Sequence, residues 1–132
     1  HLDFRRQRQM CIRDSPKNDS MKTIVGLACA AQAVADGHLV NVFFAAAGVR
    51  LLEEKYLDTL DQGMGGDSRM VRTFMDTLIE GATLHCSFGS VKAVLGHSEG
   101  DGALVVPDDQ IAWSGPPGVI ALAADSDAQL LY

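Results

Sequence analysis

The stretch GATLHCSFGSVKAVLG, residues 81–96, contains a strand pattern followed at once by a helix pattern. Residues 83–86, TLHC, have the composition of a β-strand, and the glycine- and serine-containing sequence SFGS then ends it. Residues 91–95, VKAVL, show helical spacing up to the next glycine. The pattern predicts that Cys86 lies at the carboxyl end of a strand and near the amino end of a helix. In open α/β sheets, ligands and reactive groups gather at this edge.

Cys86 is therefore the candidate catalytic residue. A thiol at the start of a helix lies near backbone N–H groups and the positive end of the helix dipole, and both favour the thiolate. His85 precedes it directly, but adjacent residues of a strand point to opposite faces of the sheet. We therefore do not assign His85 as the activating base. Lys92 falls in the first turn of the expected helix, where a solvated lysine is the commoner arrangement.

The segments on both sides of this stretch alternate between helix and strand patterns. Such alternation predicts an α/β fold with a mostly parallel sheet and right-handed crossovers. Residues 61–67, DQGMGGD, are expected to form a flexible loop, either a lid or a plain connection. The expected helices span residues 21–36, 68–80 and 119–124, and the other expected strands span residues 38–46, 103–113 (interrupted by a turn at 107–109) and 128–132.

Residues 1–15, HLDFRRQRQMCIRDS, do not resemble the rest of the chain. They are basic and show neither hydrophobic periodicity nor a helix cap, and QMCIRDS resembles a translated sequencing adapter. We therefore treat residues 1–15 as a non-native or disordered segment and residues 16–132 as a single α/β domain. An ordinary basic arm is the alternative. Folds of this class begin with a strand, so the first strand is expected to be missing or replaced.

Composition limits the classes of partner. The 132 residues suit one domain, and 47% hydrophobic residues suffice for a core. The net charge is −6, and because residues 1–15 hold four of the eleven basic and two of the seventeen acidic residues, residues 16–132 carry −8. This charge argues against binding to nucleic acid or to an anionic membrane. No apolar run approaches the about 18 residues that a membrane helix needs.

The three cysteines, Cys11, Cys29 and Cys86, form neither an even set nor a C-x-x-C pair. This argues against a disulfide framework and against a zinc cluster. Cys29 falls among alanines of a helix, where a cysteine usually packs as a small apolar residue. Cys11 falls in the segment set aside and receives no function. No metal or nucleotide cofactor is expected, and the default compartment is a reducing cytoplasm.

From residue 16 to residue 132 the chain resembles the DsrE/DsrF-like family, which includes the TusD-type sulfur-relay subunits. Four blocks carry the resemblance in the family's order. They are SPKNDS with the alanine-rich helix after it, ADGHLVNVFFAAAGVRLL (residues 35–52), GATLHCSFGSVKAVLG (81–96) and SGPPGVIALAADSDAQLLY (114–132). The resemblance implies a three-layer α/β/α fold with a five-stranded parallel sheet.

The family resemblance also implies a function. Cys86 falls on the sulfur-accepting position, which implies an intracellular sulfur carrier or sulfurtransferase subunit that relays sulfur as a cysteine persulfide. The implied partners are further copies in a trimer or hexamer, or related DsrE/DsrF-type subunits, together with a small sulfur-carrier protein.

Two other interpretations use the same residues. HCSFGSVK, residues 85–92, nearly matches the HCxxGxxR loop of cysteine-dependent phosphatases, and a rhodanese-like enzyme is a related possibility. Lys92 stands at the arginine position, and a lysine cannot form the two-pronged contact with phosphate oxygens. The other alternative is a non-catalytic oligomeric subunit in which Cys86 is only structural.

Overall fold

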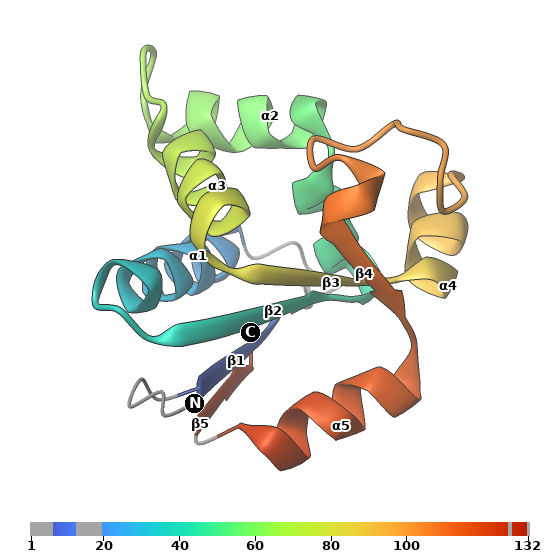
Figure 1. Ribbon diagram of the computed structural model, residues 1–132. Coiled ribbons are helices and arrows are strands. Elements are labelled where there is room, and N and C mark those ends of the chain that lie inside the picture. Colours follow the sequence, from blue (N-terminus) through green and yellow to red (C-terminus); the bar gives the residue numbers. More distant parts are fainter. Residues whose placement is uncertain (1–6, 13–19, 127, 132) are drawn as a thin grey trace.

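The computed structural model describes residues 7–12, 20–126 and 128–131, with side chains from 21 to 126 (Figure 1). The elements in chain order are β1 (Gln7–Ile12), α1 (Ser20–Ala35), β2 (Leu39–Phe44), the 3-10 helix η1 (Ala46–Leu52), α2 (Glu54–Met64), α3 (Met70–Gly81), β3 (Thr83–Ser87), α4 (Phe88–Ser90), the π-helix η2 (Val91–Leu95), the 3-10 helix η3 (Asp108–Gln110), β4 (Ile111–Ser114), α5 (Pro116–Asp125) and β5 (Ala128–Leu131).

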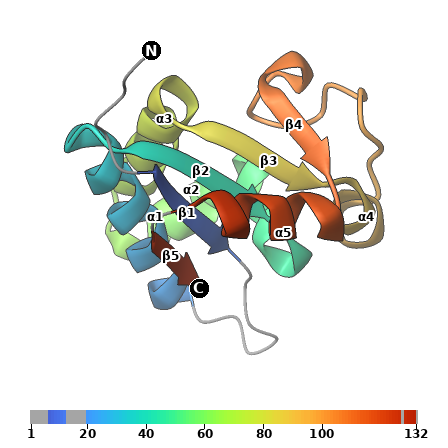
Figure 2. The ribbon, with the colours of Figure 1, turned by 60° about the horizontal axis from the view of Figure 1, so that its bottom comes forward.

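The five strands form one parallel sheet in the order β4-β3-β2-β1-β5. The chain moves outward from β1 through β2 and β3 to β4, and α5 then returns it to the opposite edge. Right-handed crossovers place helices from these two directions on opposite faces of the sheet. Accordingly, α1, α2 and α3 lie on one face and α5 lies on the other (Figures 1 and 2). The predicted three-layer α/β/α architecture is confirmed.

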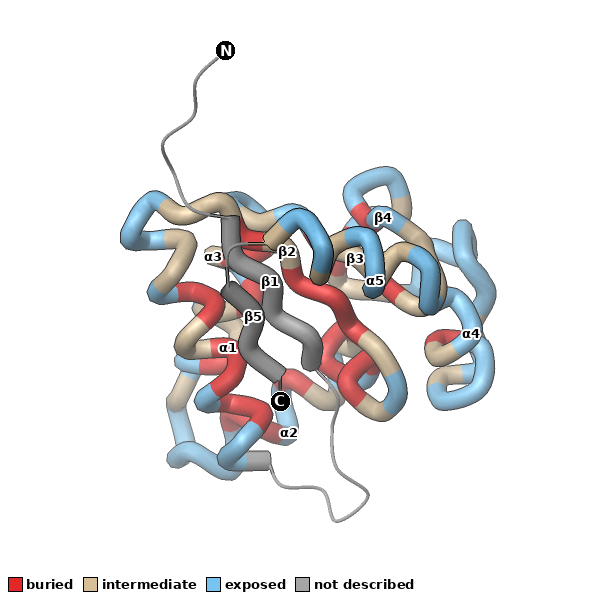
Figure 3. The backbone as a smooth tube through the Cα atoms, turned by 90° about the horizontal axis from the view of Figure 1, so that it is seen from below, coloured by how far each residue is buried: buried red, intermediate tan, exposed pale blue. Residues whose placement is uncertain are grey.

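The main core lies between the sheet and the three helices on its first face. Burial alternates along β3, and it becomes continuous over the last three residues of β2. Continuous burial is expected where both faces of a strand are covered. Figure 3 shows the buried backbone along β2 and α1, whereas α5 is intermediate or exposed. The largest fully buried side chains are those of Phe43, Phe44, Leu27, Leu51, Leu52, Leu57, Met75, Leu78, Val42 and Val49.

Of the two possibilities expected for the first strand, missing or replaced, the first is wrong. Gln7–Ile12, within the segment that the sequence analysis set aside, forms β1 and pairs in parallel with both β2 and β5. The sequence of this strand lacks the hydrophobic pattern typical of a strand. Both neighbouring strands, however, have backbone N–H and C=O groups that need hydrogen-bond partners. Pairing on two sides therefore outweighs intrinsic preference, because strand propensity depends strongly on context. Residues 1–6 and 13–15 of the segment lie outside the described part of the chain.

Two further boundaries differ from the sequence predictions. The expected loop at residues 61–67 is helical up to Met64, so the connection to α3 is shorter. Asp61 is buried there, and its Oδ1 accepts a hydrogen bond from the Val71 backbone N–H at 2.8 Å. The carboxylate thus caps α3 from the neighbouring helix, a contact that local sequence does not reveal. In the expected strand at 103–113, only Ile111–Ser114 pairs with the sheet.

Candidate functional site

Cys86 lies near the carboxyl end of β3, as predicted. In the sheet register it stands between Phe44 of β2 and Trp113 of β4. Its side chain points to the same face as that of Leu84, toward the main core, and only 1% of the residue is exposed. Cys86 is therefore part of the buried apolar cluster beneath the first helical layer.

The surroundings of Cys86 keep its thiol protonated. Burial raises the pKa of Cys86 to about 12, because a thiolate loses its hydration in an apolar cluster. The Sγ atom lies 3.8 Å from the carbonyl oxygen of Ser87, to which the S–H group donates. The expectation of an exposed thiol with a lowered pKa is wrong. The helix that follows has too few residues to build a strong dipole, and the alternation of β3 turns the side chain inward.

A short helical segment follows Cys86 at the edge of the sheet. It consists of α4 (Phe88–Ser90) and η2 (Val91–Leu95), and we call it the α4–η2 segment. The Ser87 Oγ caps its start by accepting a hydrogen bond from the Ser90 N–H at 3.2 Å. The Ser90 Oγ in turn accepts a hydrogen bond from the Ala46 N–H at 2.9 Å. The segment is thereby tied to η1, which begins at Ala46 after β2.

His85 lies on the opposite face of the sheet, in agreement with the prediction that it does not serve Cys86. Its Nε2 donates to the Asn41 Oδ1 at 3.0 Å, and its ring stacks on Phe43 with a centroid distance of 6.3 Å. Burial lowers the pKa of His85 because it disfavours the imidazolium. His85 therefore contributes to packing on the face that α5 covers.

The geometry opposes the phosphatase interpretation. A phosphate-binding loop presents free backbone N–H groups around an accessible cysteine, but here Cys86 is buried and the Ser90 N–H is already bonded to Ser87. Lys92, which stands at the arginine position, is exposed on the α4–η2 segment. These residues do not form the cradle that phosphoryl transfer requires.

The other cysteines and possible metal ligands offer no second centre within the described residues. Cys29 is partly buried in α1 and packs against the main core, as expected. Cys11 lies in β1, but its side chain is outside the described part. Among the described side chains, no group of three or more His, Cys, Asp or Glu residues is arranged to hold a metal ion. No described helix is long and apolar enough to span a membrane.

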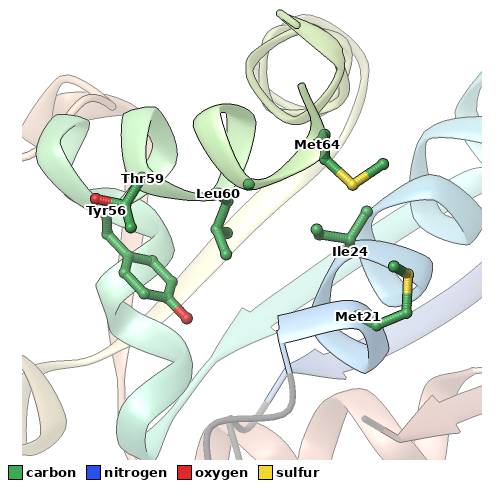
Figure 4. Close-up of a pocket in the computed structure, with 7 residues that line it drawn as sticks. Met21, Ile24, Tyr56, Thr59, Leu60 and Met64 are labelled. Carbon is green, nitrogen blue, oxygen red and sulfur yellow. The ribbon is translucent and has the colours of Figure 1, made fainter. Parts of the chain in front are cut away.

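A groove that the sequence did not predict lies between α1 and α2. Its volume is about 180 Å³, and apolar side chains from the start of α1 and the length of α2 surround it (Figure 4). Among its lining residues, Met21 is 58% exposed and Met64 is 36% exposed. The groove has one signal in the sequence. Met21 precedes Ile24 by three positions and Met64 follows Leu60 by four, so each pair lies on one face of its helix. The groove is lined by Met21, Ile24, Tyr56, Thr59, Leu60, Gly63 and Met64.

Comparisons with known proteins agree with the architecture. No protein-family model matches the sequence, and no curated protein matches it. Among solved structures, the crystal structure of the YchN protein from E. coli matches with a TM-score of 0.66 at 10% sequence identity. The match covers 96% of this chain and 99% of that chain. The fold of this chain is therefore similar to that of YchN.

Proposed function

We propose that this chain is a DsrE-like sulfur-relay subunit that carries sulfur as a persulfide on Cys86. The main support is the position of Cys86 at the carboxyl end of β3 in a fold similar to that of YchN. A second support is the resemblance of residues 16–132 to the DsrE/DsrF-like family, which implies that Cys86 is the sulfur-accepting residue. A reducing cytoplasm is the compartment in which such a thiol stays available.

The proposed relay has two transfer steps that balance without net oxidation. In the first step, the Cys86 thiolate attacks the outer sulfur of a donor persulfide. A new Sγ–S bond forms, the donor S–S bond breaks, and the donor leaves as a thiolate that takes up the proton released by Cys86. In the second step, the thiolate of a small sulfur-carrier protein attacks the outer sulfur of the Cys86 persulfide, and Cys86 returns to the thiol.

Burial sets a condition on both steps. Cys86 is 1% exposed and its pKa is about 12, so neither donor nor acceptor reaches a thiolate in the described conformation. In this proposal the structure is the closed form, and sulfur uptake requires an opening near the end of β3. Closure then shields the persulfide from water and from other thiols.

Intact-mass measurement after incubation with a persulfide donor tests the relay. The wild-type protein is expected to gain the mass of one sulfur atom, and the gain should disappear on reduction and be absent from Cys86→Ser. Cys29→Ser is the matched control, because it removes another thiol from the same face and should keep the gain. An unmodified wild type, or an equal gain in Cys86→Ser, would contradict the proposal.

The burial of Cys86 specifically favours a second candidate, a non-catalytic DsrE-like subunit in which this cysteine only fills space. In that case Cys86→Val, an apolar substitution that keeps the site filled, leaves the protein folded and every assembly function intact. The mass experiment separates the two candidates, because only the relay predicts a sulfur adduct that depends on Cys86.

We also propose that copies of the chain assemble through α5. This helix is apolar along almost its whole length, with Asp125 as its one charged residue, yet none of its residues is buried. A helix that is apolar on all sides is typical of buried positions. Ile120 is 68% exposed, the highest value among the large hydrophobic side chains described. With the rest of the chain acidic, an uncharged face is the surface on which two copies meet with least repulsion.

A further inference from the structure

The α4–η2 segment is weakly held to the rest of the molecule. Of its residues, Val91 is fully buried and Leu95 is partly buried, while Phe88 is half exposed. Segments with few buried side chains open locally at low free energy, well before the whole protein unfolds. Part of the segment is a π-helix, a rare form that occurs often at functional positions.

One polar contact ties this segment to the loop after β2. The Ser90 Oγ accepts a hydrogen bond from the Ala46 N–H at 2.9 Å, across 44 positions of sequence. Ser90 also uses its own N–H to reach the Ser87 Oγ at 3.2 Å. The Ser90 hydroxyl thus joins the first turn after Cys86 to the start of η1.

The other partner of this contact has a strained backbone. Ala46 has a φ of 50°, the left-handed region that residues with a Cβ rarely adopt. Such a conformation persists only where surrounding contacts enforce it. Opening of the contact lets Ala46 relax, so the strain favours release once the hydrogen bond is broken.

The α4–η2 segment begins directly after the end of the strand that holds the buried thiol. Cys86 is two positions before Phe88, and Val91 belongs to the same buried cluster as Cys86. Movement of the α4–η2 segment withdraws Val91 from that cluster and exposes the end of β3. The contact between Ser90 and Ala46 therefore resists the movement that uncovers Cys86.

We propose that Ser90 is a positioning residue whose hydroxyl latches the α4–η2 segment over Cys86 by holding the Ala46 N–H. Release of the latch opens a path to the thiol. The role of the latch in sulfur transfer rests on the function proposed above, but the latch itself is testable without any sulfur chemistry. Loss of one such hydrogen bond changes an opening equilibrium by about 3- to 10-fold.

The test measures the alkylation rate of Cys86 by iodoacetamide, with peptide mapping to report each cysteine separately. In Ser90→Ala the rate at Cys86 is expected to rise about 3- to 10-fold, and the rate at Cys29 should not change. Ser90→Thr keeps a hydroxyl and is expected to restore a rate close to that of wild type. Ser126→Ala is the matched control, since it removes a hydroxyl bonded to the Leu122 carbonyl on α5.

A second variant shifts the latch in the other direction. Glycine adopts a positive φ without strain, so Ala46→Gly should stabilise the closed form and slow alkylation of Cys86. Each rate is also measured at increasing sub-denaturing urea, because local opening responds weakly to denaturant whereas global unfolding responds strongly. A Ser90→Ala rate equal to wild type overturns the latch, as does an equal rise in Ser126→Ala or a rise with the urea dependence of global unfolding.

Failure of the latch and failure of the sulfur relay give different results. If Ser90→Ala accelerates alkylation while no persulfide forms on wild type, the latch stands and the relay proposal fails. If a persulfide forms on Cys86 while Ser90→Ala alkylates at the wild-type rate, the relay stands and the latch is wrong.

Discussion

At the scale of single residues, Cys86 shows how a sheet controls the reactivity of a thiol. The inward turn of its side chain places it between Phe44 and Trp113, and this environment raises its pKa to about 12. The preceding residue, His85, points to the other face of the sheet, where it contacts Asn41 and Phe43 and is partly exposed.

The raised pKa predicts the pH dependence of Cys86. At pH 8 a pKa of about 12 leaves a thiolate fraction of about 10⁻⁴ in the closed form, so alkylation of the closed form should be slow. A pKa above the unfolded value stabilises the fold fully below pH 9, and that stabilisation is lost as the pH rises toward 12. Urea titrations from pH 8 to 10.5 check this, and a free energy of unfolding that does not fall above pH 9 more than that of Cys86→Val would contradict it.

His85 makes the opposite prediction for acid. Its pKa is lowered by burial, so the folded protein holds the imidazole neutral while the unfolded chain binds a proton below pH 6.5. The stabilisation is therefore present above pH 6.5 and is lost as the pH falls from there toward the folded pKa. Thermal melts between pH 7.5 and 5 should show a smaller loss of stability in His85→Gln than in wild type. An unchanged slope in the variant would refute the assignment.

At the scale of elements, α2 and α3 are joined by a buried carboxylate. Asp61 Oδ1 accepts from the Val71 N–H at 2.8 Å, and Oδ2 accepts from the Arg72 N–H at 3.2 Å. Asp61→Ala should lower the free energy of unfolding by about 1–3 kcal/mol, because two donors at the start of α3 lose their acceptor. Urea titration gives the value.

The matched control for this prediction is Asp58→Ala on the same helix. Asp58 pairs with Arg72 at 3.1 Å, but its side chain is 55% exposed. Because the Asp58 carboxylate is exposed and Glu54 still pairs with Arg72 at 3.3 Å, this variant should lose at most about 1 kcal/mol. Equal losses in the two variants would show that burial of the Asp61 carboxylate has no special role.

The elements that follow from local pattern were predicted, and those set by distant partners were not. The helix expected at residues 21–36 and the strand at 38–46 carry their own periodicity and match α1 and β2 closely. By contrast, the inward burial of Cys86 depends on the register of three strands. The Ser90 contact joins residues 44 positions apart. β1 likewise depends on pairing with two distant strands, so its local sequence gave the wrong expectation.

At the scale of the whole molecule, the exposed apolar surface of α5 predicts self-association. Multi-angle light scattering of the wild-type protein should give a mass above that of one chain. Ile120→Asp places a charge in the proposed interface and should shift the mass toward the monomer. Val25→Asp is the control, because Val25 is 45% exposed on α1, across the sheet from α5. A monomeric wild type, or dissociation by Val25→Asp alone, would contradict assembly through α5.

The position of β1 has a consequence for synthesis on the ribosome. β1 acquires its first neighbour once Leu39–Phe44 is made, but its other neighbour is Ala128–Leu131. Between these two events β1 is an edge strand of the nascent sheet, and the N–H and C=O groups that β5 later pairs with have no partner in the sheet. Open edges of this kind recruit strands from other chains. The interval before β5 docks is therefore when the protein most needs a chaperone.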